Sequence, residues 1–414
     1  MKIRDINISS KESSAIKGNK IRLIIEFLEE NYMIRINRFK QSEKEIISKS
    51  KRYEFPPSLD DISLHLQENE IAVSDGILRK IINSPNQIKT FNPIREYFES
   101  LTPYAGISHI DKLCNSMQAV SYDDQEADYY QTRMLKLIKK WLVASVACSL
   151  DGQQNEVNLG LIQEEEGTGK TTICEFLCPE PLKTMMVKSD KEKNGFKIRE
   201  AFTENFFVLF DEFIGLNKFT AEDFKSTISA HELDVKGHND PFPRRRKRIA
   251  NALFTSNNKT GANRGFLIPA LGTRRFACVH LESIDYEKII SEVIVNEIWA
   301  EAYMLYNNGF DYKFGPDDFR EFREFNQRFM IETNAVQLIE SNFAKPINGS
   351  DGQLMMPTDI LLYFQERKVA GRDVLNNLSP IKIGTALKQL GYFKEERRID
   401  GIPRHPYRVV PLYM

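Results

Sequence analysis

The sequence predicts an α/β protein with a mostly parallel central sheet and a phosphate-binding loop after the first strand of that sheet. Three observations favour this fold. Short apolar runs of strand composition alternate with helical segments in the middle of the chain. A glycine-rich loop follows the first run, and two acidic residues follow a later one. The apolar runs span residues 157–162, 184–187, 206–210, 250–255 and 276–280.

The length of 414 residues predicts two or three domains. A hydrophobic fraction of 41% and a charged fraction of 28% are typical of a globular protein. The net charge of −1 gives no global attraction to nucleic acid, so such binding must come from local basic patches. Because no apolar run approaches ~18 residues and the N-terminus is polar, we expect a cytoplasmic protein with no membrane partner.

The cysteines and histidines show no metal-ligand spacing. The five cysteines are scattered, and the six histidines form no pairs of the kind that bind zinc. Buried free thiols in a reducing compartment are therefore expected. The cysteines are Cys114, Cys148, Cys174, Cys178 and Cys278.

The first part of the chain reads as scaffold. Residues 1–90 are predicted to form a mainly helical domain, with a possible strand at 33–39 and Ser74 at the start of a helix. Residues 91–150 continue as a helical segment, with Pro93 at a first helical position. This segment ends in a long amphipathic helix over 128–150.

The loop after the first strand carries most of a P-loop. Its glycines let backbone N–H groups approach phosphate oxygens, and its lysine reaches the outer phosphates. The hydroxyl of Thr171, directly after the lysine, can bind Mg²⁺. The following helix points its positive end at the same anion. The residues are Gly167, Thr168, Gly169, Lys170, Thr171 and Thr172. The usual first glycine is replaced by Glu164, and we expect the side chains of the 164–166 run to point away from the phosphates.

The strand at 206–210 delivers two acids at its carboxyl end. Beside a P-loop, Asp211 is expected to hold Mg²⁺ or its water, and Glu212 is expected to polarise an attacking water. The alternative is a strand that simply ends in solvated acids.

Two basic features follow. A short strand at 233–238 and the basic run at 243–248 would form a hairpin, which is either a solvated face or a phosphate-binding surface. Arg274 and Arg275 stand at the entrance of the last strand. An arginine there could stabilise charge on a transferring γ-phosphoryl group, in its own subunit or in a neighbour, or could form an ordinary salt bridge.

The last sixty residues are predicted to form a winged-helix domain after a linker at 343–357. Ser379 and Pro380 begin a helix that Gly391 ends, and Asp400-Gly401 is a hairpin turn between 393–399 and 407–410. A basic side is expected from Lys382, Lys388, Arg397, Arg398, Arg404 and Arg408.

Four motifs stand in order along the chain: GTGKTT, FFVLFDEF, ALFTSNN and GTRRF. Together they resemble the virulence-associated E family of phage and genomic-island proteins, which is grouped with the superfamily 3 helicases. The segments NPIREYFESL and KLIKKWLVASVA are also similar to what precedes the P-loop in that family. The similarity covers roughly residues 20–285 by motifs, and residues 355–414 more loosely.

This resemblance implies an AAA+ ATPase core over residues 151–310, followed by a helical connector over 311–354 and the winged helix over 355–414. It implies a homo-oligomeric ring, usually a hexamer, with ATP and Mg²⁺ bound between subunits. Lys170, Thr171, Asp211 and Glu212 would act on ATP, Asn257 would orient the attacking water, and Arg274 or Arg275 would be the arginine finger. The hairpin at 233–248 would face the central pore of the ring and contact DNA. The contacting residues would be Lys236, His238, Arg244, Arg245, Arg246 and Lys247.

The expected function is an ATP-dependent DNA helicase that moves on single-stranded DNA and serves the replication of a phage or mobile genetic element. Too few residues precede the core for a primase domain, so a separate primase is a possible partner. Two alternatives stay open. One is a replication initiator that binds DNA without processive unwinding, and the other is a protein-remodelling or defence ATPase.

Overall fold

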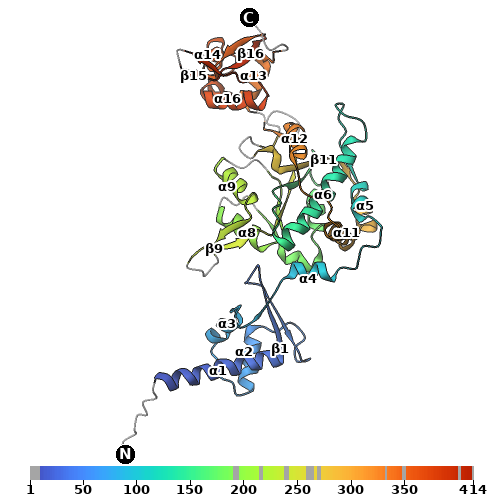
Figure 1. Ribbon diagram of the computed structural model, residues 1–414, viewed down its shortest axis with the longest axis vertical. Helices are drawn as coiled ribbons and strands as arrows, with labels where there is room; N and C mark the ends of the chain where they lie inside the picture. Colours follow the sequence, from blue (N-terminus) through green and yellow to red (C-terminus); the bar gives the residue numbers. More distant parts are fainter. Residues whose placement is uncertain are drawn as a thin grey trace, which may run out of the picture.

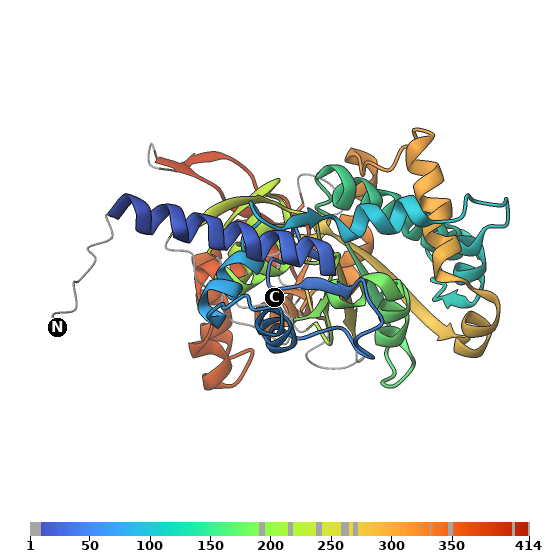
Figure 2. The ribbon, with the colours of Figure 1, turned by 90° about the horizontal axis from the view of Figure 1, so that it is seen from below.

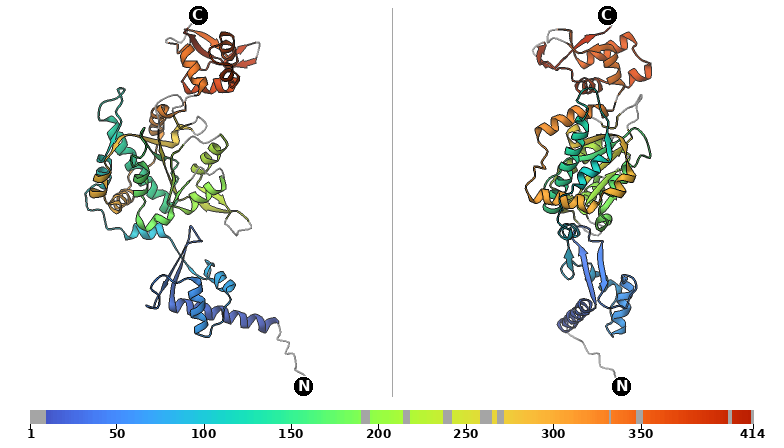
Figure 3. Two further views of the ribbon diagram at one scale, coloured as in Figure 1. Left: turned by 180° about the vertical axis from the view of Figure 1, so that it is seen from behind. Right: turned by 90° about the vertical axis from the view of Figure 1, so that its right-hand side faces the viewer.

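The computed structural model places three groups of packed side chains one after another along the long axis of the molecule (Figures 1 and 3). The N-terminal group lies at one end, the group around the largest sheet lies in the middle, and the C-terminal group lies at the other end. The structure describes residues 10–189, 195–213, 218–236, 242–257, 265–267, 272–331, 333–346, 351–399 and 402–412.

The N-terminal group packs helices against a small sheet of order β2-β1-β3. Helix α1 buries Ile24, Phe27 and Leu28 on this sheet, and its first turns extend beyond the neighbouring elements (Figure 2). The strand predicted at 33–39 is confirmed as β1, although the sheet around it was not predicted. The elements are α1 Ser10–Asn31, β1 Tyr32–Asn37, β2 Lys44–Ser48, α2 Leu59–Glu68, α3 Asp75–Ile82 and β3 Lys89–Phe91.

The central sheet has the order β4-β11-β5-β10-β7-β6. All neighbours pair in parallel except β4, which runs antiparallel to β11. The five predicted strands are confirmed, and β6 begins later than expected because a 3-10 helix precedes it. The strands are β4 Met117–Ala119, β5 Asn158–Ile162, β6 Met186–Lys188, β7 Phe207–Phe210, β10 Asn251–Ser256 and β11 Phe276–Ile284.

Helices cover both faces of this sheet, which is why its strands read as continuous apolar runs. Helices α5 (His109–Asn115), α6 (Tyr129–Asp151) and α11 (Val295–Asn307) lie on one side, and α8 (Gly195–Glu204) and α9 (Lys218–Ile228) lie on the other (Figure 1). Strand β7 illustrates the two faces, because Phe207 packs on Trp141 and Trp299 while Phe210 packs on Phe224. All residues of β5, β7 and β10 are buried.

The remaining elements of the central group surround the sheet. None of the helices in the described ranges combines the length and the apolar character that a membrane crossing requires. The elements are α4 Pro93–Ser100, α5 His109–Asn115, α6 Tyr129–Asp151, α7 Lys170–Phe176, η1 Glu180–Met185, α8 Gly195–Glu204, α9 Lys218–Ile228, β8 Glu232–Val235, β9 Arg244–Lys247, η3 Thr273–Arg275, α10 Tyr286–Glu292, α11 Val295–Asn307, α12 Pro316–Phe325 and η4 Asn326–Phe329.

The C-terminal group corrects two predictions. The linker expected at 343–357 contributes β12 and β13, which both pair with β16. The hairpin expected between 393–399 and 407–410 is formed instead by β14 and β15, which pair with each other. Its turn residues, 400–401, lie outside the described residues. The elements are α13 Asn334–Asn342, β12 Phe343–Ala344, β13 Gln353–Met355, α14 Pro357–Arg367, α15 Arg372–Asn376, α16 Pro380–Gln389, β14 Arg397–Ile399, β15 Ile402–Arg404 and β16 Tyr407–Pro411.

Close packing between β5 and β10 gives a stability prediction. A Cβ atom added to Gly160 would lie 1.9 Å from Cζ of Phe254, which is closer than any real contact. We expect Gly160→Ala to lower the midpoint of thermal unfolding by several degrees, because overpacking costs about 1–3 kcal/mol. Combining it with Phe254→Leu should cost less than the sum of the two single changes. Additive losses, measured by differential scanning calorimetry, would contradict this account.

Candidate functional site

The glycine-rich loop joins the carboxyl end of β5 to the start of α7. Gly167 and Gly169 have φ values of 72° and 93°, in a region that side-chain-bearing residues adopt only with strain. Helix α7 begins at Lys170. The sequence therefore places glycine at the two positions of the loop where the backbone needs it.

Lys170 is buried and held by the loop itself. Its Nζ atom donates to the backbone oxygen of Glu165 at 2.7 Å and to Oγ1 of Thr168 at 3.1 Å. Burial lowers the pKa of Lys170, and the negative charges of Glu166, Asp211 and Glu212 oppose that shift. The ammonium group thus rests on uncharged oxygens that an incoming anion could replace.

Asp211 accepts two hydroxyl hydrogen bonds. Oγ1 of Thr171 and Oγ1 of Thr255 each donate to Oδ1 of Asp211 at 2.7 Å. Burial alone would raise the pKa of Asp211, but these two hydrogen bonds lower it below its ordinary value. The carboxylate is therefore held in its charged form beside Thr171.

Thr255 also fixes the turn that follows Asp211. The backbone N–H of Glu212 donates to Oγ1 of Thr255 at 3.0 Å, and the N–H of Phe213 donates to the Thr255 carbonyl oxygen at 2.7 Å. Glu212 has a φ of 48°, which is rare for a residue other than glycine and marks local strain. Thr255 was not among the predicted site residues. The available signal was a hydroxyl near the end of a strand that finishes at the same edge of the sheet.

A cavity of about 230 Å³ joins these groups. It contains all six predicted loop residues, both acids and Asn257, so the structure brings together every residue predicted to act on ATP except the arginines. Glu166 also lines it, whereas Glu164 and Glu165 do not, so the run expected to point away does not lie wholly outside. The lining residues are Glu166, Gly167, Thr168, Gly169, Lys170, Thr171, Thr172, Asp211, Glu212, Thr255 and Asn257.

The paired arginines lie at the opposite edge of the sheet. Asn158, at the start of β5, donates from Nδ2 to the backbone oxygen of Arg275 at 2.8 Å. Four residues of strand, or about 13 Å, separate Asn158 from Ile162 at the end that leads into the loop. Neither Arg274 nor Arg275 therefore lies beside the cavity of its own chain.

The two arginines differ in their surroundings. The side chain of Arg275 is 12% exposed, and its Nε donates to Oγ of Ser229 at 3.1 Å. The side chain of Arg274 is 49% exposed and lies 3.5 Å from Oε2 of Glu156. Arg275 is thus anchored in its own subunit, whereas Arg274 is presented outward.

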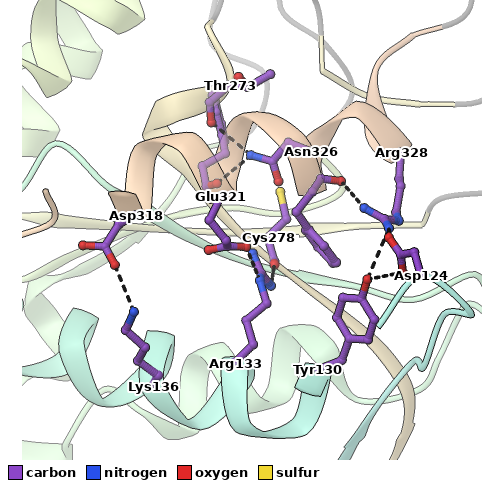
Figure 4. A network of polar contacts seen from close by, with 12 residues as sticks. Asp124, Tyr130, Arg133, Lys136, Thr273, Cys278, Asp318, Glu321, Asn326 and Arg328 are labelled. Atoms are coloured by element: carbon purple, nitrogen blue, oxygen red, sulfur yellow. Dashed lines mark hydrogen bonds and ion pairs between the residues drawn. The ribbon is translucent and has the colours of Figure 1, made fainter. Parts of the chain in front are cut away.

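Element η3, Thr273–Arg275, carries both arginines and is here called the arginine turn; polar contacts from α6, α12 and η4 support it (Figure 4). Nδ2 of the buried Asn326 donates to the backbone oxygens of Thr273 and Phe276 at 3.0 and 2.7 Å. Arg133 on α6 pairs with Glu321 on α12 and donates to the Cys278 oxygen at 2.8 Å. Both ends of η3 are therefore fixed from the following helical segment, which sequence reasoning treated as a connector.

Strands β8 and β9 form the predicted hairpin, with Glu232 opposite Lys247 and Asp234 opposite Arg245. Lys236, Arg244, Arg245 and Lys247 are exposed, whereas Arg246 pairs with Glu204 at 2.7 Å. His238 lies outside the described residues. Arg248, the last cation of the basic run, is buried and donates to backbone oxygens of Ile228 and Asn155, so it is structural. The cations of the hairpin are partly balanced by acids across the strands.

Among solved structures, the chain is similar to the apo structure of the NrS-1 C-terminal region (305–718), which is 12% identical with a TM-score of 0.45; the match covers 94% of this chain and 99% of that chain. The X-ray structure of JCV helicase is 10% identical with a TM-score of 0.29 and covers 65% of this chain and 77% of that chain. No curated protein matches the sequence. Residues 99–331 match the model of the virulence-associated protein E-like domain. This range of the chain includes the glycine-rich loop, both acids, Asn257 and both arginines. The chain therefore belongs to the virulence-associated protein E-like family.

Proposed function

We propose that the protein binds ATP and Mg²⁺ in the cavity at the carboxyl ends of β5, β7 and β10. It would hydrolyse the bond between the β- and γ-phosphates of the ATP. The observation that carries this proposal is the 2.7 Å contact between the Thr171 hydroxyl and the charged Asp211 carboxylate, directly beside the glycine-rich loop. Two hard oxygen donors at this separation fit the ligand preference of Mg²⁺. A bound Mg²⁺ would neutralise charge on the phosphate oxygens.

Each residue of the cavity then has a role. Loop N–H groups would cradle the phosphates, and the Lys170 ammonium would exchange the Glu165 oxygen for a phosphate oxygen. Glu212 would accept a proton from the attacking water, and Asn257 would orient that water. The strained backbone at Glu212 is held by Thr255, which would keep the base in place before the substrate arrives.

The arginine turn supports a second copy of the chain as part of the site. Because the turn and the cavity lie at opposite edges of one sheet, an arginine can complete the site only across an interface between subunits. We assign this role to Arg274, since Arg275 is anchored to Ser229. This arrangement supports a homo-oligomeric ring, for which the family resemblance implies a hexamer.

We further propose that ATP turnover drives movement along single-stranded DNA, as a helicase in the replication of a phage or mobile element. The exposed cations of β9 and Lys236 support DNA contact. Helices α14 to α16 followed by the β14-β15 ribbon support a C-terminal winged helix. Its basic side is smaller than the sequence indicates, because Arg408 pairs with Glu395 at 2.5 Å.

The charge balance across β8 and β9 keeps the initiator as a second candidate, since Glu232 and Asp234 weaken the hairpin's hold on phosphates. A strand-displacement assay on a forked duplex separates the two. A helicase unwinds the duplex processively in the presence of ATP, whereas an initiator binds and melts only a short region. No effect of DNA in any assay would favour the protein-remodelling alternative.

The first test is ATP turnover with and without single-stranded DNA. We expect Lys170→Ala to lower turnover by about 100-fold or more, because it removes the charge that acts on the transferring phosphate. The exposed Lys80→Ala is the matched control and should behave as wild type. Turnover that survives in Lys170→Ala would show that the site is assigned wrongly, and a rate unaffected by DNA would remove the helicase proposal.

Thr255 gives a second test. We expect Thr255→Val to lower kcat by about 10- to 100-fold, because it removes a hydrogen bond to a charged carboxylate worth about 1.5–3 kcal/mol. KM for ATP should change little, since the loop contacts stay intact. Thr255→Ser keeps the hydroxyl and should retain most activity. A loss in Thr255→Ser as large as that in Thr255→Val, measured by steady-state kinetics, would show that the hydroxyl hydrogen bonds do not account for the effect.

The arginine assignment predicts complementation between subunits. Arg274→Ala and Lys170→Ala should each be inactive alone, but their mixture should recover part of the turnover. In mixed rings, a Lys170→Ala subunit supplies Arg274 to a neighbour whose cavity is intact. Arg275→Ala should lower thermal stability and show no such recovery. The reverse result, with recovery only for Arg275→Ala, would move the role to Arg275.

A further inference from the structure

A second cavity lies where the N-terminal group meets the central sheet. The hairpin of β1 and β2 points toward the central group (Figure 1), and the cavity beside its tip has a volume of about 530 Å³. Its wall combines the hairpin tip, α4, the end of α6 and strand β9. The charged and amide side chains that the argument uses are Arg38, Gln41, Arg95, Arg246 and Lys247.

This cavity, here called the N-terminal cleft, carries excess positive charge. Arg95 lies 3.5 Å from Asp151, and Arg246 pairs with Glu204 at 2.7 Å. Arg38 and Lys247 are exposed, and neither has an ion pair with any residue in the described part of the chain. Arg38 therefore faces the cleft without a paired acid, and Lys247 has only the acid opposite it on β8, Glu232, so the cleft favours an anionic ligand.

Specific contacts join the N-terminal group to the central group beside the cleft. Arg35 on β1 donates to both carboxylate oxygens of Glu96 on α4 at 2.7 and 3.0 Å, and Lys40 donates to the Thr184 backbone oxygen at 3.1 Å. At the other wall, a Cβ atom added to Gly152 would lie 3.3 Å from Cδ of Lys247, and Gly152 has a φ of 68°. Glycine at this position ends α6 and leaves room for the lysine stem.

We propose that the N-terminal cleft binds the sugar-phosphate backbone of single-stranded DNA where the strand leaves the β8-β9 hairpin. Arg246 and Lys247 belong to both surfaces, so the two form one continuous track. Arginine and lysine bind phosphate oxygens, and the Gln41 amide can donate to a phosphate or sugar oxygen. The volume of about 530 Å³ lies within the range of ligand-binding pockets, about 300–1,000 Å³. This inference rests on the proposed DNA-dependent function and extends the contact to the N-terminal group.

Binding of fluorescein-labelled oligo(dT) to the full chain, followed by anisotropy over a range of salt concentrations, tests the cleft. We expect Arg38→Glu to weaken binding by about 10-fold, and Arg38→Ala to reduce the slope of log affinity against log salt by about one. Lys80→Glu makes the same charge change in the same group, on the exposed face of α3 away from the cleft, and should bind like wild type. Equal affinities for Arg38→Glu and Lys80→Glu would overturn the proposal.

A hairpin variant separates the failure of this inference from the failure of the proposed function. Arg245→Glu should weaken binding because Arg245 is exposed on β9. If Arg245→Glu weakens binding and Arg38→Glu does not, the hairpin binds DNA and the cleft does not. If the wild-type chain does not bind oligo(dT) at all, the DNA-dependent function fails together with the inference.

Cross-linking gives a readout that does not depend on affinity. All five native cysteines are buried, so a cysteine introduced at exposed Gln41 can carry a photo-activated cross-linker selectively. We expect Gln41→Cys to cross-link labelled oligo(dT), and Lys80→Cys to cross-link at background level. Equal yields at the two positions would overturn the cleft, and higher yield with duplex than with single strands would overturn the assignment of single-stranded DNA.

Discussion

The parallel register of β5, β10 and β7 is the constraint on which the site depends. Leu253 and Phe254 of β10 pair with Leu159 and Gly160 on one side and with Leu209 and Phe210 on the other. This register makes the carboxyl ends of the three strands coincide. Thr255 then reaches both Asp211 and the N–H of Glu212, and the glycine-rich loop comes within hydrogen-bond distance of the same carboxylate. The contact of Phe254 with Gly160 favours this alignment, because a larger residue at position 160 would collide with the ring.

The parts of the fold and site that local sequence specifies were predictable. The buried strands have a near-continuous apolar composition, and the glycine-rich loop and the two acids follow strands at fixed positions. The edge of the sheet at which each residue lies follows from the direction of its strand. That simple rule already places Lys170, Asp211 and Asn257 together and separates them from Arg274 and Arg275.

The parts that depend on contacts distant in sequence were not predictable. Thr255 resembles any strand threonine until β7 lies beside it, and Asn326 shows no signal of its contact with the arginine turn 50 residues earlier. The basic run at 243–248 looks uniform in sequence. Pairing with β8 places acids opposite two of its cations, burial removes Arg248, and Glu204 engages Arg246. Charge counted along a chain therefore overstates the charge that a surface presents.

The separation of the cavity and the arginine turn across one sheet has a consequence for how activity scales with the amount of protein. A single copy holds two complementary halves of the proposed site but cannot bring them together. Specific activity should then rise with concentration and fall on dilution, so that turnover begins only when enough copies accumulate to associate. Under the proposed function, low-level expression in a cell would consume little ATP, and a threshold of expression would act as the switch.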